Sequence, residues 1–347
     1  MKFGKLKVDS YCPIFLPDIG TFFNKNLDIA FDLIVKLAKS KVKVIKGEIL
    51  HNANICFRDF SSIEYYDKSK VKNEENYRKL IERKVNSLET YKKIIDFCKN
   101  YGLETIFSVY DIDAAKFAKL NGVSALKIAS SNIVHKPLIS FCAKLDLPTI
   151  IDTGDSSIKE IARAVEWWQV ESKKSNNLIV EHSPYPYPKS LKDHNLNLMV
   201  NLGKLFNLPF GLSDHHIGDE MLYAATALGA IILEKGVSPD QLYKEQDILH
   251  SLPVSKVKSV IEKCNNISKA MGNGSRYLNP ERKKKISRMC LVAKKNLKKG
   301  DLINLKNIAF SFPVKGIQVE MWDLVSNKSL NKSILKNHPI RINDVKI

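Results

Sequence analysis

Short apolar runs alternate with longer amphipathic segments over the first 265 residues, and the apolar runs end on polar side chains. The segment 27–40 is typical of the amphipathic type, because Ile29, Leu33 and Leu37 fall on one face of a helix. The apolar runs have the length of strands that are buried on both faces. We therefore predict strands at 11–16, 42–45, 105–108, 125–129, 148–151, 178–180, 209–212 and 230–233.

Helices separate these strands. We predict them at 27–40, 77–100, 114–120, 137–144, 157–171, 195–205 and 251–267, with one more in the Ala-rich segment after Gly218. Residues 51–72 have no sustained period and are predicted to form a large loop. Eight strands that alternate with helices predict an α/β fold of the (β/α)8 TIM-barrel type. A doubly wound open sheet is the alternative, but no glycine fingerprint follows the first strand.

A closed barrel would bring the polar strand ends together at one mouth, which is where parallel α/β folds bind their ligands. The run Ser213 to His216, followed by Glu234-Lys235 at the next strand end, favours a site over a solvated loop. The side chains expected around the mouth are Asp18, Lys46, Ser108, Lys127, Ser130, Asp152, His182, Ser213, His215 and Glu234.

Lys127 lies among apolar residues in a predicted buried strand, where an unpaired ammonium would cost several kcal/mol. Its partner is either an internal carboxylate such as Asp152 or an anionic group of a ligand. Lys46 at another strand end favours a dianionic ligand. His215 and His216 are adjacent and point in opposite directions on an extended backbone, so at most one of them is a metal ligand.

The C-terminal part has a different pattern. Residues 266–285 are rich in Asn, Gly and basic side chains and are predicted to be a linker between a barrel domain at 1–265 and a second domain at 286–347. The second domain consists of short apolar pieces with Gly and Pro, which indicates a small all-β module. So small a module buries little core and is expected to dock, for instance on the barrel mouth of a partner subunit.

Composition narrows the class of protein. The 347 residues are 44% hydrophobic, which is ordinary for a globular protein, and no apolar run approaches the ~20 residues that span a bilayer. The N-terminus lacks a signal sequence, and the six Cys have no CxxC spacing, so we expect a cytoplasmic protein without a disulfide framework. The net charge of +18 is carried mainly by Lys, which favours a solvated surface over nucleic-acid binding.

Several motifs occur in an order and at a spacing that resemble the sialic acid (N-acetylneuraminate) synthase family. They are Leu126-Lys127-Ile128-Ala129-Ser130, Thr153-Gly154, Tyr187-Pro188, Gly211-Leu212-Ser213-Asp214-His215, Glu234-Lys235 and Asp247 with Ser251-Leu252-Pro253. The tail resembles that family's antifreeze-like (SAF, β-clip) domain, through Cys290 to Ala293, Lys299-Gly300-Asp301 and Asn307-Ile308. The resemblance covers nearly the whole chain.

The resemblance implies an enzyme that condenses phosphoenolpyruvate with an N-acetylmannosamine-type amino sugar, giving a nine-carbon 2-keto sugar acid and phosphate. It also implies a divalent metal, Mn²⁺ or Mg²⁺, and a domain-swapped homodimer without nucleic-acid or membrane partners. Asp18, His215 and Asp247 would be catalytic, with His215 as metal ligand. The residues implied for phosphoenolpyruvate are Lys46, Ser108, Lys127, Ser130 and Ser213.

This chain departs from the family pattern at the sugar and metal end. Gly236 stands where the family has a second metal-ligating histidine, so His216 or Glu234 would have to replace it. The family's strand-one glutamate corresponds to Asp18. The family's SAF-domain arginine that meets the partner's sugar aligns with Phe312, and Lys315 is the nearest cation. Further departures are Phe22-Phe23 for an Asn-His stretch, Asp152 for a phosphate-facing serine and Tyr185 for a Ser or Asn.

Three hypotheses remain open from the sequence. The first is an active synthase with a different sugar, which both lysines and the serines favour. The second is a divergent homologue with weak or altered catalysis. The third is a binding or assembly protein that uses the SAF-like module as an interaction surface.

Overall fold

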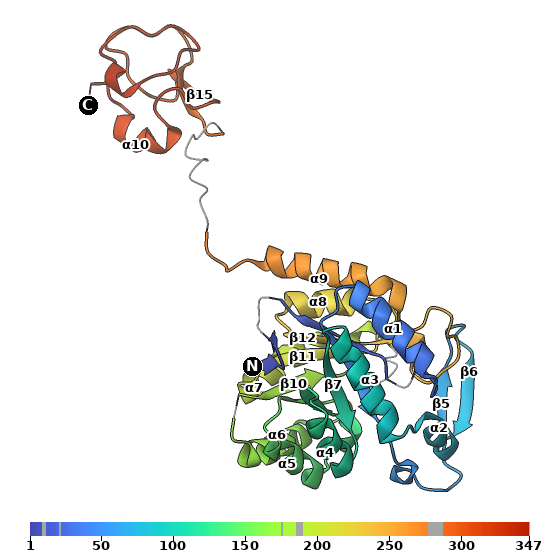
Figure 1. The fold of residues 1–347 in the computed structure, drawn as a ribbon. Helices are drawn as coiled ribbons and strands as arrows, with labels where there is room; N and C mark the ends of the chain where they lie inside the picture. The colour runs from blue at the N-terminus through green and yellow to red at the C-terminus, as the bar shows by residue number, and fades with distance from the viewer. Residues whose placement is uncertain (9–11, 21, 175, 185–189, 277–286, 347) are drawn as a thin grey trace. The chain divides into compact units, whose positions relative to one another are not determined.

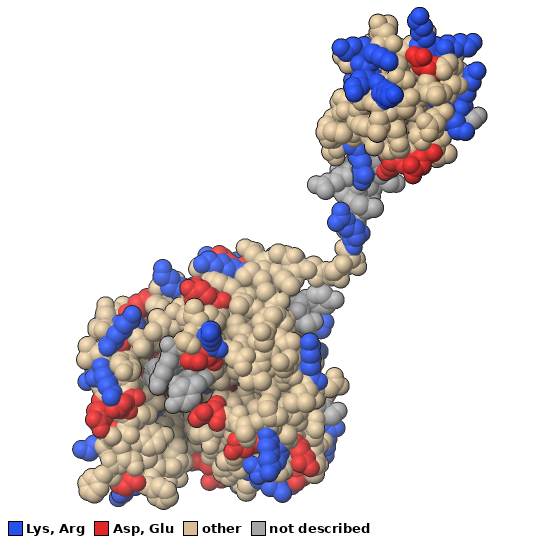
Figure 2. Space-filling model, turned by 180° about the vertical axis from the view of Figure 1, so that it is seen from behind, with Lys and Arg blue, Asp and Glu red and all other residues tan. Residues whose placement is uncertain are grey.

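The computed structural model describes residues 1–8, 12–20, 22–174, 176–184, 190–276 and 287–346. Backbone contacts divide the chain into two units, Met1–Asn273 and Gly274–Ile347 (Figure 1). On the face shown in Figure 2, Lys and Arg are spread over both units, and Asp and Glu lie among them on the larger unit. This distribution is typical of a solvated charged surface. No helix among the described residues is long and apolar enough to cross a membrane.

The larger unit is a closed barrel of eight parallel strands, which confirms the predicted fold (Figure 1). Each strand pairs with the next along the chain, and β12 pairs back onto β3 to close the ring. The strands are β3 (Ile14–Asp18), β4 (Val44–Ile49), β7 (Glu104–Val109), β8 (Ala125–Ile128), β9 (Thr149–Asp152), β10 (Leu178–His182), β11 (Phe210–Asp214) and β12 (Ile232–Ser238). A short β13 (Leu252–Pro253) extends the sheet beside β12.

Helices cover the outside of the barrel, and their apolar faces form one large core with the outward side chains of the strands. Side-chain caps fix several helix starts. Asn26 caps α1, Ser87 caps α3 and Asp111 caps α4 by accepting backbone N–H groups of the first turn. The helices are α1 (Leu27–Lys39), α3 (Leu88–Asn100), α4 (Ile112–Leu120), α5 (Lys136–Lys144), α6 (Ile158–Glu171), α7 (Leu196–Phe206), α8 (Glu220–Ala227) and α9 (Val257–Met271).

The barrel interior has two layers because side chains alternate between the two faces of each strand. The lower layer is apolar and includes Ile150, Ile179 and Ile232. Phe3 also packs into it from the N-terminal hairpin of β1 (Lys2–Phe3) and β2 (Leu6–Lys7), which the sequence did not predict. Two residues further along each strand, at the carboxyl ends, the inward positions are polar, and this upper layer forms the floor of the site.

Two predictions between β4 and β7 were wrong. The helix predicted at 77–100 is two helices, α2 (Tyr77–Lys84) and α3, because Val85 and Ser87 adopt extended conformations and Ser87 caps the second helix. The predicted loop at 51–72 contains the strand β5 (Ser62–Tyr66), which forms an antiparallel hairpin with β6 (Lys72–Asn76). Alternating Ile63 and Tyr65, of which Tyr65 is buried, carry this strand pattern.

The ends of the larger unit also differ from the prediction. The helix predicted at 251–267 begins only at Val257, after a single 3-10 turn at Val254–Lys256, and it continues to Met271. The strand predicted at 11–16 begins at Ile14, and Tyr11 lies outside the described residues.

The smaller unit contains the antiparallel pair β14 (Cys290–Ala293) and β15 (Ile308–Ser311) and the short helix α10 (Trp322–Val325). Leu291, Ile308, Val325 and Ile340 belong to its own apolar core. The predicted strand near 289–293 is therefore confirmed.

Candidate active site

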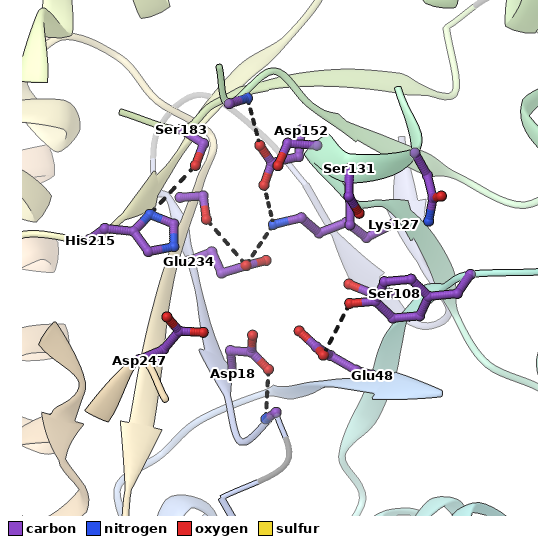
Figure 3. Close-up of a pocket in the computed structure, with 18 of the residues that line it drawn as sticks. Asp18, Glu48, Ser108, Lys127, Ser131, Asp152, Ser183, His215, Glu234 and Asp247 are labelled. Atoms are coloured by element: carbon purple, nitrogen blue, oxygen red, sulfur yellow. Dashed lines mark hydrogen bonds and ion pairs between the residues drawn. The ribbon is translucent and has the colours of Figure 1, made fainter. Parts of the chain in front are cut away.

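A cavity of about 890 Å³ opens at the carboxyl ends of the barrel strands. This is the size of a small-molecule site. Figure 3 shows side chains from different strands that point toward one another in it. The sequence-predicted residues that line the cavity are Asp18, Lys46, Ser108, Lys127, Ser130, Asp152, Ser213, His215, Glu234, Gly236 and Asp247.

Lys127 lies at the centre of a carboxylate cluster. Its Nζ is 2.9 Å from Asp152 Oδ2, 2.7 Å from Glu181 Oε2 and 2.6 Å from Glu234 Oε1. The Lys127 side chain is 3% exposed, and burial alone would lower its pKa. The three carboxylates outweigh burial and hold the Lys127 pKa well above its usual value. The salt bridge to Asp152 that the sequence left open is therefore present.

Lys46 forms the second buried ion-pair group. Its Nζ is 2.5 Å from Asp18 Oδ2, 3.5 Å from Glu234 Oε1 and 3.6 Å from Glu48 Oε1. Burial lowers the Lys46 pKa, but the carboxylates, Asp18 first, outweigh it and raise the pKa. Glu234 thus contacts both lysines and links the two groups.

The carboxylates differ in their affinity for protons. Burial raises the pKa of Asp18 to about 7, against the opposing effect of Lys46. Burial would also raise the pKa of Glu234, but Lys127 and Lys46 outweigh it and lower the pKa to about 2. Asp18 can therefore exchange a proton near neutral pH, which suits a general acid or base, whereas Glu234 stays ionised.

Sequence reasoning missed Glu181 and Glu48. Both lie on inward positions, Glu181 two residues after the interior Ile179 and Glu48 two residues after Lys46. Glu48 accepts a hydrogen bond from the Tyr110 hydroxyl at 3.1 Å. The expectation that His182 faces the mouth was wrong, since its Nε2 lies 2.9 Å from the carbonyl oxygen of His194. Strict alternation from Ile179 would have selected Glu181 over His182.

Two imidazoles meet at the β11 side of the cavity. The ring centroids of His215 and His250 are 4.9 Å apart, and both residues line the pocket. Asp247 lies beside them, with Oδ1 3.8 Å from His250 Nε2, and Ser183 Oγ is 3.5 Å from His215 Nδ1. Burial first, then His215 and Lys235, hold the pKa of His250 well below its usual value, so its imidazole is neutral. The sequence analysis did not single out His250.

Asp214, which also lines the cavity, and its neighbours His216 and Lys235 make contacts outside the lysine–carboxylate cluster. Asp214 Oδ2 is 2.7 Å from Lys235 Nζ, and both side chains are buried. Lys235 also donates to the carbonyl oxygen of His216. The His216 ring contacts His194, and its Nε2 is 3.3 Å from Glu220 Oε2. His216 is not among the residues that line the cavity.

Gly236, which stands in the place of the family's second histidine, lies beside an aromatic ring. A Cβ on Gly236 would lie 3.5 Å from Phe22 Cε2 and 3.7 Å from Ser251 Cβ. Phe22 lines the cavity and is largely buried. His250, on the loop after β12, lines the same cavity as Gly236 and so brings an imidazole to it from outside the strand.

The loop that carries Asp247 is fastened to α2. Arg83 binds the carboxylate of Glu245, which is 1% exposed. The Nη2 atom of Arg83 also lies 3.0 Å from Glu75 Oε2. Lys84 Nζ donates to Gln246 Oε1 at 3.0 Å. These contacts hold the residues just before Asp247 in place.

Among the described residues, no group of three or more His, Cys, Asp or Glu side chains is arranged to hold a metal ion. The wall formed by His215, His250 and Asp247 nevertheless offers imidazole and carboxylate donors that suit a divalent cation. These residues therefore fit a metal that takes two imidazole nitrogens from the protein and its remaining ligands from water or substrate.

Five further positions named in the sequence analysis belong to the smaller unit or lie outside the described residues. Lys315 is exposed in the smaller unit, and its backbone N–H donates to Cys290 Sγ. Phe312 is 58% exposed in the same unit. Tyr185 and the pair Tyr187-Pro188 lie outside the described residues. The role of Lys315 at a partner's sugar stays a prediction.

Comparisons with known proteins agree with this geometry. The model of the NeuB family matches residues 33–276, and the model of the SAF domain matches residues 288–346. The N,N'-diacetyllegionaminic acid synthase of Campylobacter jejuni is 27% identical over 330 residues, covering 94% of this chain and 98% of that protein. The pseudaminic acid synthase of Helicobacter pylori is 23% identical over 337 residues, covering 96% and 98%.

A solved structure shows the same fold. The N-acetylneuraminic acid synthetase of Leptospira borgpetersenii, crystallised with citrate, superimposes with a TM-score of 0.71 at 22% identity, over 83% of this chain and 95% of that one.

Proposed function

The chain belongs to the NeuB family, and from this premise we propose that it is a nonulosonic acid synthase. The reaction condenses phosphoenolpyruvate with an N-acetylmannosamine-type amino sugar. The observation that carries the proposal is the convergence of two buried lysines, Lys46 and Lys127, on one cavity at the carboxyl end of a closed barrel. Ammonium groups buried in such a place are suited to a ligand with several negative charges.

The chemistry follows from the two substrates. C3 of phosphoenolpyruvate forms a bond to the aldehyde carbon of the sugar, and the aldehyde oxygen takes up a proton. Water adds to C2 and loses one proton; the bond between C2 and the phosphate oxygen then breaks, and the remaining hydroxyl proton passes to the departing phosphate, which leaves a 2-keto-3-deoxy acid. Each step needs an anion held in place and a proton moved at a defined atom.

The chain's own residues divide these tasks. Lys46 and Lys127 hold the carboxylate and phosphate of phosphoenolpyruvate. The hydroxyls that add neutral donors at this end are those of Ser108, Ser130 and Ser213, and Ser108 Oγ is buried without a hydrogen-bond partner among the described groups. Asp18, whose pKa lies at about 7, exchanges the proton of the aldehyde oxygen or of the attacking water.

At the sugar end, Asp247, His215 and His250 face the cavity. His215 and His250 would hold a divalent metal, Mn²⁺ or Mg²⁺, which supplies Lewis-acid polarisation of the aldehyde when bound. Asp247 orients the sugar hydroxyls beside this pair. This arrangement uses His250 in place of the family histidine that Gly236 replaces.

Phosphate release tests the proposal. The full-length protein is incubated with phosphoenolpyruvate and a panel of amino-sugar aldehydes, with and without Mn²⁺. Release that requires both the metal and one class of sugar supports a synthase and identifies its substrate. Phosphoenolpyruvate binding without release for any sugar would instead support a divergent homologue, and absence of binding would support a protein with an assembly role.

A further inference from the structure

The ammonium of Lys127 faces more negative charge than it can neutralise. Asp152 approaches it from β9, Glu181 from β10 and Glu234 from β12, all within 3 Å of Nζ. Lys46 does not relieve the excess, because it contacts Asp18 and Glu48 as well as Glu234. Two ammonium groups thus face five carboxyl groups in a buried space, an excess of three negative charges when all are ionised.

Such an excess opposes the binding of an anionic substrate. Like charges a few ångströms apart in a buried site repel strongly and favour protonation of one member. An anion that binds at Lys127 therefore needs at least one of the neighbouring carboxyl groups to be neutral. The contacts of each group show which one carries the proton.

Asp152 and Glu234 each meet two donors. Asp152 Oδ1 accepts a hydrogen bond from the backbone N–H of Gly154 at 3.0 Å, and its Oδ2 meets Lys127. Glu234 Oε1 accepts from Lys127 at 2.6 Å and from the hydroxyl of Ser213 on β11 at 3.3 Å. Glu234 Oε2 has no hydrogen-bond partner among the described groups, but Lys127 and Lys46 outweigh burial and hold the pKa of Glu234 below its usual value.

Glu181 has a different environment. Its side chain is completely buried, and it does not line the cavity. Oε2 contacts Lys127 at 2.7 Å, but Oε1 has no hydrogen-bond partner among the described groups. Burial first, then Glu234, raise the pKa of Glu181 to about 8, although Lys127 acts in the opposite direction. Glu181 is therefore the carboxyl group beside Lys127 that most readily holds a proton.

We propose that Glu181 is protonated whenever the anionic substrate is bound at Lys127, so that binding is coupled to proton uptake. The inference rests on the proposed function, since it takes phosphoenolpyruvate as the anion. Glu181 acts through Lys127 and is a positioning residue. In its neutral form it leaves the ammonium charge of Lys127 available to the ligand, and in its ionised form it competes with the ligand for that charge.

Calorimetric titration with phosphoenolpyruvate, without sugar, tests the coupling. At pH 9 most of the free protein has Glu181 ionised, so the wild-type protein should take up about one proton per ligand bound. Titrations in two buffers of different ionisation enthalpy measure this number. Across the pH range above 8, the dissociation constant should rise about tenfold per pH unit.

The Glu181→Gln variant mimics the protonated side chain. It should bind phosphoenolpyruvate at pH 9 about tenfold more tightly than the wild type and take up no proton at this site. Glu166→Gln, on an exposed position of α6, is the matched control and should behave as the wild type. Proton uptake in the wild type is measured without any substitution, so the test holds even if Glu181→Gln does not fold.

Two results would overturn the inference, and they can be told apart. If the wild type binds phosphoenolpyruvate at pH 9 without proton uptake, or if Glu181→Gln takes up the same proton, Glu181 does not have this role and the proposed function stands. If the wild type binds no phosphoenolpyruvate between pH 6 and pH 9, the proposed function and this inference fall together.

Discussion

Lys127 on β8 and Glu234 on β12 meet across the centre of the barrel, with Nζ 2.6 Å from Oε1. Four steps separate these strands in either direction around the ring, so they lie on opposite sides of it. Their contact joins the two halves of the mouth through one buried ion pair. The fold needs both charges, because a buried charge without its partner destabilises the folded state by its full desolvation cost.

Replacement of Lys127 by Met should therefore lower stability as well as ligand binding. The substitution leaves the carboxylates of Asp152, Glu181 and Glu234 without their shared cation, and loss of one partner of a buried pair costs about 3–5 kcal/mol. The loss should be smaller at pH 5.5 than at pH 8, because protonation removes the uncompensated charge. Urea denaturation at both pH values measures it.

Lys116→Met is the control for this variant. Lys116 is 55% exposed and contacts the exposed Asp113, so its loss should cost less than about 1 kcal/mol. A Lys127→Met protein that keeps wild-type stability at pH 8 but no longer binds phosphoenolpyruvate would show that the carboxylate cluster has no structural role.

Stability should also fall as pH rises above neutrality. The pKa of Asp18 is raised to about 7 and that of Glu181 to about 8, so the folded protein binds more protons than the unfolded chain from about pH 4 to pH 8. Stability from these groups is present at low pH and is lost as pH rises through their folded pKa values. Each group contributes a slope of up to about 1.4 kcal/mol per pH unit.

Urea denaturation from pH 6.5 to pH 8.5, followed by tryptophan fluorescence, checks this slope. A Trp322→Phe background removes the signal of the smaller unit and leaves Trp167 and Trp168 on α6, of which Trp168 is buried. Glu181→Gln should flatten the dependence, whereas an unchanged slope in that variant would assign it to other groups. Glu234, whose pKa is lowered to about 2, acts oppositely, and its stabilisation is lost only as pH falls toward 2.

The barrel could be predicted from the sequence because each strand is a short apolar run and each run is followed by a helix with a clear apolar face. The division of residues 77–100 into two helices could not be predicted, because the break at Val85 to Ser87 contains neither Gly nor Pro. Strand alternation from Ile179 would have been sufficient to place Glu181 in the barrel interior, although the sequence analysis selected His182. The ion pairs at the mouth could not be predicted from the sequence. The register of the strands and the closure of the barrel decide that Lys127 meets Glu234 and that Lys46 meets Asp18.

The Arg83–Glu245 ion pair should control the sugar end from outside the cavity. Arg83→Met removes the contact that fixes the loop before Asp247, so the Michaelis constant for the sugar should rise roughly tenfold while phosphoenolpyruvate affinity is unchanged. Steady-state kinetics with each substrate varied in turn separates the two effects. Lys72→Met, which breaks an exposed pair with Glu64 on the neighbouring hairpin, should change neither constant. An equal loss for both substrates would contradict a role confined to this loop.

His250 should be needed for metal binding even though no strand end carries it. Its ring centroid lies 4.9 Å from that of His215, and it lines the same cavity as Gly236. His250→Gln keeps much of the side-chain volume but removes the imidazole, so Mn²⁺ affinity should fall by about 10- to 100-fold. Electron paramagnetic resonance of free Mn²⁺ in titrations without substrate measures this affinity directly.

His338→Gln is the control. His338 is exposed in the smaller unit, so this variant should bind Mn²⁺ as the wild type does. If His250→Gln also binds normally, the second protein ligand is not His250, and Gly236 has no replacement on this loop.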